Sequence, residues 1–188
     1  MIKISKYIYN LSQNLVKYFD IANNYIWIST TKNNFVSLIF FLKTHEVFLF
    51  RTLTDIVAYD IPGRKNRFSV IYNLFSLSYN TRIYINVQIR EGVSISTIFD
   101  IFKSADWLER EVFDMFGIYF SNHPNFRRIL TDYGFKGHPL RKDFPVSGFY
   151  ELFFDSWVSE TVYQRIELVQ EYRNFDFPSP WTKKSLAI

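Results

Sequence analysis

The side chains best suited to chemistry gather between Ala105 and Pro145, where carboxylates, histidines and arginines are interleaved with aromatic residues. A carboxylate beside His123 or His138 would suit general acid–base catalysis, in which a side chain passes a proton to or from a substrate. A complete catalytic site also needs a nucleophile with a neighbouring base, an anion cradle or a metal, and the sequence gives no sign of these. The pattern therefore favours binding between proteins over catalysis.

The sequence also argues against a bound cofactor. It contains no cysteine, and iron–sulfur clusters are held mainly by cysteine thiolates. The three histidines, His45, His123 and His138, are far apart and form no HExxH pair, so we expect no metal site. The glycines form no glycine-rich phosphate loop, so NADH and FMN have no evident site.

A helix is expected from about Trp107 to Phe116. The run Asp106-Trp107-Leu108-Glu109 has the form of a capping box with Asp106 as the N-cap, and Gly117 stands where a glycine commonly ends a helix.

On a helical wheel, Glu109 falls inside the apolar arc of this helix, whereas Arg110, Glu111 and Asp114 fall on the opposite side. A carboxylate among apolar side chains is costly unless it is hydrogen-bonded or paired with a cation. We therefore predict that Glu109 pairs with an arginine of the following segment. The candidates are Arg127, Arg128 and Arg141. The alternative for the Glu-Arg-Glu run is an ordinary solvated helix face.

The elements that must position these residues include a sheet. Apolar and polar residues alternate from Arg82 to Arg90, which predicts a strand with one buried and one wet face. Asn80-Thr81 joins this strand to one expected over Phe68–Ser78 as a hairpin. We also expect strands over Tyr25–Thr30 and Glu46–Thr54, and a helix from about Phe35 to Lys43. The predicted fold class is α+β, with a mixed, partly antiparallel sheet packed by helices.

The first twenty residues place Ile4, Ile8, Leu11 and Leu15 at helical spacing. They contain no arginine and no small-residue cleavage pattern, so we expect an amphipathic helix that stays on the mature protein instead of a targeting sequence.

After Gly117 the character of the chain changes. Prolines and glycines interrupt the sequence, and sustained periodicity is lost, although Thr161–Leu168 has the pattern of a strand. Aromatic residues stay frequent, which is not typical of a disordered tail. We therefore predict an α+β domain over residues 1–117 and a long extended C-terminal arm over residues 118–188 that docks on partner subunits. The expected anchors are Phe144, Tyr150, Phe153, Phe154, Trp157 and Trp181.

Composition excludes some classes of protein. The 188 residues carry a net charge of +4, and the longest apolar run, Phe35 to Leu42, is far shorter than the roughly 20 residues of a spanning helix. We therefore expect a soluble or membrane-peripheral protein. The heavy use of Phe, Tyr, Ile and Asn indicates an AT-rich genome, such as that of an organelle.

Several spaced motifs, in the same order, resemble those of the respiratory NADH dehydrogenase 30-kDa subunit family, a component of complex I. They are Glu109-Arg110-Glu111, Asp114, His123, Arg127-Arg128-Ile129-Leu130-Thr131, and upstream Asp60-Ile61-Pro62-Gly63-Arg64-Lys65-Asn66-Arg67-Phe68. Downstream, Gly137-His138-Pro139-Leu140-Arg141-Lys142-Asp143-Phe144-Pro145 and Glu171-Tyr172-Arg173-Asn174-Phe175-Asp176-Phe177 resemble the mitochondrial and proteobacterial branch. The likeness extends from Phe35 to Trp181.

The resemblance implies a non-catalytic subunit in the peripheral arm of NADH:ubiquinone oxidoreductase, which scaffolds the quinone-reducing module. It implies contact chiefly with the large quinone-site subunit of the 49-kDa family, on the matrix side of the mitochondrial inner membrane. FMN, iron–sulfur clusters and ubiquinone would lie on other subunits. The residues expected to stabilise the motif or to form the subunit interface are Glu109, Arg110, Glu111, Asp114, Arg127, Arg128, His138, Arg141, Lys142 and Asp143.

Two alternatives come from other classes. An RNA-binding organellar ribosomal protein would use the basic and aromatic run Arg64-Lys65-Asn66-Arg67-Phe68. We expect no nucleic acid as a partner, because acidic residues nearly balance basic ones and no RNP-like motif is present. The second alternative is the equivalent subunit of a hydrogenase-type complex.

Overall fold

Alternating apolar residues build a five-stranded sheet at the centre of the N-terminal part of the chain. Its strands are β1 (Tyr18–Ala22), β2 (Tyr25–Thr30), β3 (Thr52–Asp60), β4 (Phe68–Ser76) and β5 (Thr81–Ile89), in the order β1-β2-β5-β4-β3. The pair β2 and β5 is parallel, and the other three neighbouring pairs are antiparallel. The computed structural model describes residues 14–22, 25–173 and 175.

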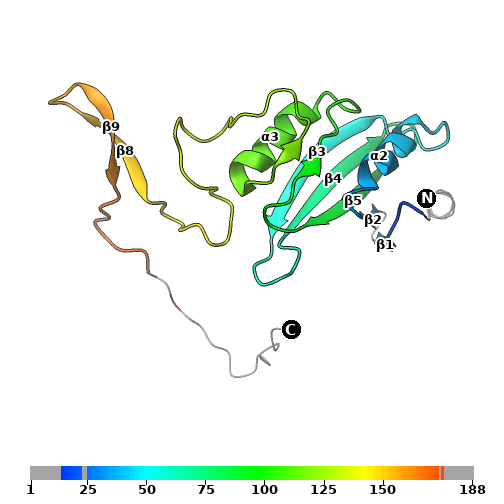
Figure 1. Ribbon diagram of the computed structural model, residues 1–188, viewed down its shortest axis with the longest axis horizontal. Helices are drawn as coiled ribbons and strands as arrows, with labels where there is room; N and C mark the ends of the chain where they lie inside the picture. Colours follow the sequence, from blue (N-terminus) through cyan, green and yellow to red (C-terminus); the bar gives the residue numbers. More distant parts are fainter. Residues whose placement is uncertain (1–13, 23–24, 174, 176–188) are drawn as a thin grey trace. The chain divides into compact units, whose positions relative to one another are not determined.

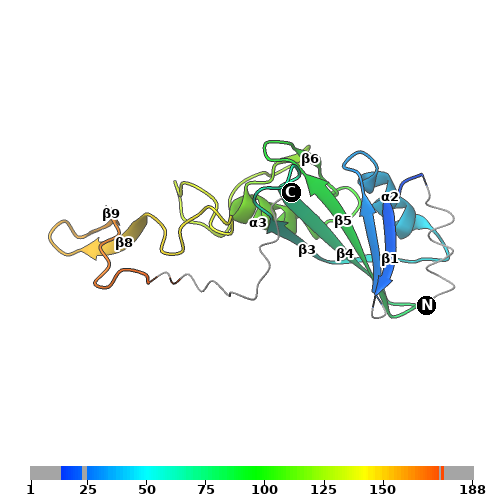
Figure 2. The same cartoon turned by 90° about the horizontal axis from the view of Figure 1, so that it is seen from below.

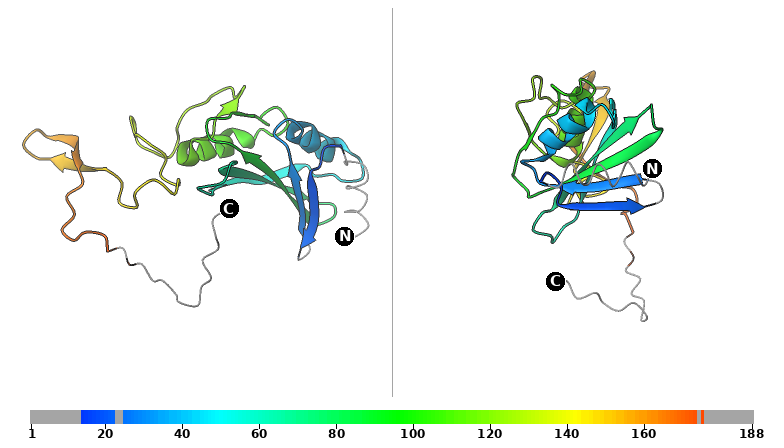
Figure 3. Two further views of the ribbon diagram at one scale, coloured as in Figure 1. Left: turned by 60° about the horizontal axis from the view of Figure 1, so that its bottom comes forward. Right: turned by 90° about the vertical axis from the view of Figure 1, so that its right-hand side faces the viewer.

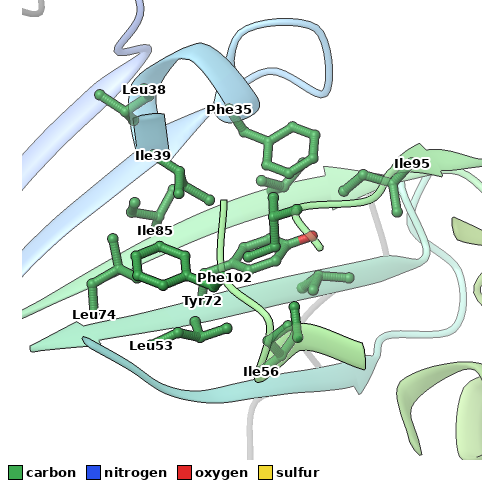
Figure 4. Packing of buried hydrophobic residues seen from close by; sticks show 14 of the residues in the cluster. Phe35, Leu38, Ile39, Leu53, Ile56, Tyr72, Leu74, Ile85, Ile95 and Phe102 are labelled. Carbon is green, nitrogen blue, oxygen red and sulfur yellow. The ribbon is translucent and has the colours of Figure 1, made fainter. Parts of the chain in front are cut away.

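Two helices, α2 (Phe35–Thr44) and α3 (Ala105–Phe116), cover one face of this sheet (Figures 1 and 3). Seen from below, the strands lie in front of the helices (Figure 2). Between the two layers lies the core, in which the ring of Phe35 stacks on that of Tyr72 with 5.4 Å between centroids (Figure 4). Both side chains are fully buried. In the described part of the chain, neither helix has the length and apolar character of a membrane span.

Two short strands bring the chain on either side of α3 together. Strand β6 (Ile95–Ser96) precedes the helix, and β7 (Phe120–Ser121) follows it and pairs with β6 in parallel. The residues just after β6 therefore lie beside the helix, where they can meet its side chains.

The chain divides into two compact units between Phe144 and Pro145. The second unit contains the antiparallel hairpin of β8 (Tyr150–Asp155) and β9 (Glu160–Arg165). The division lies later than the predicted domain boundary at residue 117. The residues after Gly117 are fastened to α3 by hydrogen bonds, for example from the amide of Leu130 to Asp114 and from Arg141 to the carbonyl of Phe116. Such long-range contacts leave no periodic pattern in the sequence.

The α+β class is confirmed, with a mixed sheet and two helices in the part of the chain that the structure describes. The predicted strand over Tyr25–Thr30, the helix from Phe35 and the hairpin into β5 are also present. The strand predicted over Glu46–Thr54 was misplaced, since β3 begins at Thr52. The chain before it makes turns, with hydrogen bonds from the amides of Phe48 and Leu49 to the carbonyl of His45.

The predicted N-terminal helix lies mostly outside the described residues. The helical spacing on which it rests runs from Ile4 to Leu15, and strand β1 begins three residues later, at Tyr18. Strand β8 was not predicted, whereas β9 covers the first part of the strand expected over Thr161–Leu168.

Candidate functional site

Helix α3 is the centre of the predicted site. It begins at Ala105 after Ser104, and it ends at Gly117, whose φ of 75° is left-handed and whose amide donates to the carbonyl of Phe113 at 2.8 Å. Apolar residues alone do not fill its buried surface, because Glu109, Arg110 and Asp114 are buried as well. Of the polar residues placed on its outer side by the wheel, only Glu111 is exposed. The alternative of an ordinary solvated helix face is therefore wrong for Arg110 and Asp114.

The buried position predicted for Glu109 is confirmed, and its predicted arginine partner is not. Its carboxylate accepts the amide hydrogen of Ile98 at 2.8 Å and the hydroxyl hydrogen of Thr97 at 2.5 Å. Both donors belong to the chain that follows β6. Burial raises the pKa of Glu109 to about 7, although these two hydrogen bonds oppose the shift.

His123 lies beside this carboxylate. Its buried side chain places Nε2 at 3.9 Å from Glu109 Oε2 and at 3.4 Å from Asp106 Oδ1. Its Nδ1 accepts the amide hydrogen of Asn125 at 3.3 Å, whereas Nε2 is buried beside the two carboxylates and makes no hydrogen bond among the described residues. His123 and Glu109, two of the acid–base groups of the sequence, thus lie side by side with fully buried side chains.

Asp106 and Arg110 form the outer part of the same cluster. Arg110 binds the Asp106 carboxylate at 3.2 Å and its carbonyl oxygen at 3.1 Å, and its guanidinium lies 4.4 Å from the ring centroid of Trp107. Asp106 was predicted to cap the helix, but it lies within the first turn.

Asp114 holds the segment that follows the helix. One carboxylate oxygen accepts three consecutive backbone amide hydrogens, from Ile129 at 3.1 Å, Leu130 at 2.7 Å and Thr131 at 2.9 Å. The other accepts the Thr131 hydroxyl at 2.6 Å and Arg128 Nη1 at 3.3 Å. Burial alone would raise the pKa of Asp114, but the hydrogen bonds from Thr131, Leu130 and Ile129 outweigh it and hold this pKa below its usual value.

The carbonyl groups at the end of α3 are satisfied by the segment around residue 140. His138 Nδ1 donates to the carbonyl of Asp114 at 2.9 Å, and Arg141 Nε donates to that of Phe116 at 2.6 Å. The amide of Leu140 donates to the carbonyl of Met115 at 3.1 Å. An arginine here also complements the negative end of the helix dipole. Burial lowers the pKa of His138, and the nearby arginines lower it further.

A second anchor was missed by the sequence reasoning. The buried carboxylate of Asp60 receives two bonds of 2.8 Å from the guanidinium of Arg67 and one of 3.0 Å from the amide of Lys142. The hydrogen bond from Arg67 lowers the pKa of Asp60 although burial opposes it. The register of β3 and β4 pairs Asp60 with Phe68. A correct prediction of β3 would therefore also have predicted that Asp60 and Arg67 lie close together.

The remaining predicted residues contribute less. Asp143 is exposed and binds Arg67 at 3.0 Å, whereas Lys142 contributes its backbone amide. Arg127 and Glu111 are exposed, and no ion pair of either is present among the described residues. The structure therefore brings eight of the ten predicted residues into contacts around α3 and the Asp60 anchor, and leaves these two at the surface.

The second unit carries a different feature, a hairpin with exposed apolar side chains. Trp157 at its tip is 96% exposed, and Phe154 is 64% exposed. Other exposed large residues of the hairpin and its start are Phe149, Tyr150, Leu152, Phe153, Val158 and Tyr163. Of the predicted anchors, Phe144 belongs to the first unit and lies half-buried near Phe135, and Trp181 lies outside the described residues.

The donor set on α3 does not form a metal centre. Within residues 14–22, 25–173 and 175, no three histidine, aspartate or glutamate side chains are placed to hold a metal ion. Among these charges, Glu109 binds residues 97–98, Arg110 binds Asp106 within the helix, and Asp114 fastens residues 128–131 to the helix.

The chain is similar to proteins of known family. Residues 28–150 match the family described as "Respiratory-chain NADH dehydrogenase, 30 Kd subunit". The chain is 48% identical to the C subunit of the NADH-quinone oxidoreductase of Roseobacter denitrificans over 179 residues, which cover 95% of this chain and 90% of the relative. It is 50% identical to "NADH dehydrogenase [ubiquinone] iron-sulfur protein 3" of Beta trigyna over 156 residues, 83% and 81% of the two chains.

Among solved structures, the fold is similar to a chain in the structure of the membrane-bound sulfane sulfur reductase, an archaeal respiratory membrane complex. The TM-score is 0.66 at 22% identity, over 76% of this chain and 84% of that one. The family match covers more than half of the chain, and the relatives agree with it along most of its length. The chain therefore belongs to the respiratory-chain NADH dehydrogenase 30-kDa subunit family.

Proposed function

We propose that this chain is a non-catalytic structural subunit of NADH:quinone oxidoreductase, and that it positions the quinone-reducing module in the peripheral arm. The observation that carries the proposal is the β8–β9 hairpin, whose aromatic and aliphatic side chains are exposed along both strands and the tip. A two-stranded hairpin is marginal in water by itself. Exposed apolar patches of this kind mark surfaces that bind other proteins.

The buried charges of α3 support the same role. In an enzyme, strongly perturbed carboxylates usually face a cleft. Here Glu109 and Asp114 are fully buried and are used to hold neighbouring backbone segments. Glu109 fixes the chain that follows β6, and Asp114 fixes residues 129–131, which lie in the first unit.

We propose that the redox groups lie on other subunits. The name of the Beta trigyna relative contains "iron-sulfur protein". This chain has no cysteine among its 188 residues, and its three histidines are spread over the sequence. Such a donor set does not fit an iron–sulfur cluster, which needs thiolates for most of its ligands. No step of electron transfer is therefore assigned to residues of this chain.

For the partner, we propose the large quinone-site subunit of the 49-kDa family, contacted through the hairpin. For the location, we propose the matrix side of the mitochondrial inner membrane and an organellar gene, which the AT-rich type of composition supports.

The RNA-binding alternative loses its main support in the structure. Arg67 is engaged by Asp60, Glu91 and Asp143, and Phe68 is only 2% exposed. A buried ring cannot stack on a base, and a paired guanidinium is less available to phosphate.

Cross-linking mass spectrometry on the intact membrane complex tests the proposal. We expect links from residues around the hairpin to the large quinone-site subunit, and no stoichiometric iron or flavin on the separated chain by elemental analysis and absorption. A chain that purifies with its own cluster or flavin, or that never associates with the complex, would overturn the assignment.

A further inference from the structure

A network of arginines and carboxylates forms a fixed platform in the first unit. Arg67 binds Asp60, and it also binds Glu91 at 2.9 Å and Asp143 at 3.0 Å. Arg141 binds the same Glu91 at 2.8 Å. The guanidinium carbons of Arg67 and Arg141 each lie 5.2 Å from the ring centroid of Phe68. These contacts hold the turn between β3 and β4, the loop after β5 and the residues after Arg141 in one arrangement.

Beside this platform lies an open hollow of about 430 Å³. Its charged lining consists of Arg64, Lys65, Arg67, Arg90, Glu91 and Asp143, and the turn residues Pro62 and Gly63 complete it. Arg64, Lys65 and Arg90 are exposed. Within the part of the chain that the structure describes, no ion pair neutralises these three cations. The cluster of α3 does not use them either.

The character of the lining selects the kind of anion. The hollow is larger than a single phosphate requires. Its two carboxylates, Glu91 and Asp143, are paired with Arg67 and Arg141 and leave the other three cations of the lining for a ligand. No aromatic ring lines it, so it offers no platform on which a base could stack. A polypeptide carboxylate carries one charge and matches the fork of a guanidinium.

We propose that this hollow is a second docking site, which binds an acidic segment of a neighbouring subunit through carboxylates that pair with Arg64, Lys65 and Arg90. The site lies in the first unit and uses none of the hairpin residues. The proposal rests on the proposed role as a subunit of a larger assembly, and it adds the chemistry of one partner surface. It predicts an aspartate or glutamate of another chain within direct contact of Lys65.

A zero-length carbodiimide cross-link on the intact complex tests this contact, because the reagent joins a lysine amine only to a carboxylate that touches it. We expect a link between Lys65 and an aspartate or glutamate of another subunit. The link should disappear in Lys65→Arg, which keeps the charge but has no reactive amine, while the complex still assembles. A complex in which Lys65 links only to its own chain, or reacts fully with a water-soluble amine reagent, would overturn the proposal.

A binding assay on the full chain separates this proposal from the proposed function. The probes are a fluorescent glutamate-rich peptide, a 20-nucleotide RNA and inorganic pyrophosphate. We expect salt-sensitive peptide binding that falls at least about tenfold, equivalent to about 1.4 kcal/mol, in the double variant Arg64→Glu/Arg90→Glu. The matched control, Lys32→Glu/Lys103→Glu, makes the same charge change at exposed positions away from the hollow and should alter binding less than about twofold.

Either of two results would overturn the acidic-peptide proposal in this assay. One is equal peptide binding by the hollow variant and the control variant. The other is tighter binding of RNA or pyrophosphate that depends on the same arginines. Failure of the chain to join the complex, in contrast, would count against the proposed function and leaves this assay to decide the docking site.

Discussion

Replacing Glu109 with glutamine tests the electrostatics of α3 most sharply. The carboxylate is fully buried, accepts the amide of Ile98 and the hydroxyl of Thr97, and has a pKa raised to about 7 from the ordinary value of 4.5. The titratable groups near it include Asp106, whose charge adds to the increase, His123, whose Nε2 lies at 3.9 Å, and the buried Tyr72, whose own pKa the Glu109 charge helps to raise. Glutamine keeps an acceptor for Ile98 and has no charge at any pH.

The sign and size of the effect follow from proton linkage. Because the pKa is higher in the folded chain, the folded chain holds a proton between pH 4.5 and about 7 that the unfolded chain has released. The contribution of this bound proton to the free energy of unfolding is fully present below pH 4.5 and is lost as the pH rises through 7. With one pKa unit worth 1.36 kcal/mol, the stability of the wild-type chain relative to Glu109→Gln should fall by about 2.5 kcal/mol between pH 5 and pH 8.

Urea unfolding of the full chain, followed by circular dichroism at several pH values, measures this difference. Glu111→Gln is the matched control, because Glu111 is the exposed glutamate of the same helix, and its relative stability should stay constant within about 0.5 kcal/mol. Carbon-13 spectra of the glutamate carboxyl groups give the pKa of Glu109 directly. The burial argument would be refuted if the free energy of unfolding of Glu109→Gln changed with pH in the same way as that of the wild type. It would also be refuted if Glu109 titrated below pH 5.

Two further substitutions test how residues 118–144 are fastened. Asp114→Asn should destabilise the chain by about 2–4 kcal/mol, because a neutral amide cannot accept all five bonds of the carboxylate, whereas Asp100→Asn at an exposed site should change little. Since the pKa of Asp114 is lowered, its contribution should be present above its ordinary pKa of 3.8 and lost at more acid pH, as urea unfolding would show. Gly117→Ala should cost clearly more than the about 1 kcal/mol of Gly92→Ala, because both glycines have φ near 75° but only a Cβ at 117 would lie 2.5 Å from Arg141 Nη2. Equal unfolding midpoints for the two alanine variants would contradict the packing of Arg141 against the helix end.

The sequence predicted the elements with strong local patterns. The alternation from Arg82 to Arg90 corresponds to β5, and Gly117 ends α3 in the left-handed conformation expected for a C-terminal glycine. The wheel also identified Glu109 as buried. These features depend on residues close together in the chain, which a periodicity argument can read.

The partners of the buried charges could not be predicted in the same way. The wheel assumes that a helix contacts the core on one side and water on the other, whereas α3 is covered on its far side by residues 128–141. Asp114 is therefore buried, and three of its five hydrogen bonds come from backbone amides. Because almost every residue has a backbone amide, the sequence does not indicate which ones will bind. Glu109 likewise found the amide of Ile98 instead of an arginine. Long-range pairs such as Asp60 with Lys142 depend on the tertiary fold alone.

Hydrogen exchange on the isolated chain and on the whole membrane complex tests the central claim, that this chain is a structural subunit whose second unit docks on a neighbour. We predict that amides of β3, β4 and β5 are protected in both states, because they pair within the chain's own sheet. Amides of residues 145–173 should be protected only in the complex, since their apolar side chains are exposed in the chain alone. Equal protection of residues 145–173 in both states, or equal exposure in both, would contradict the account.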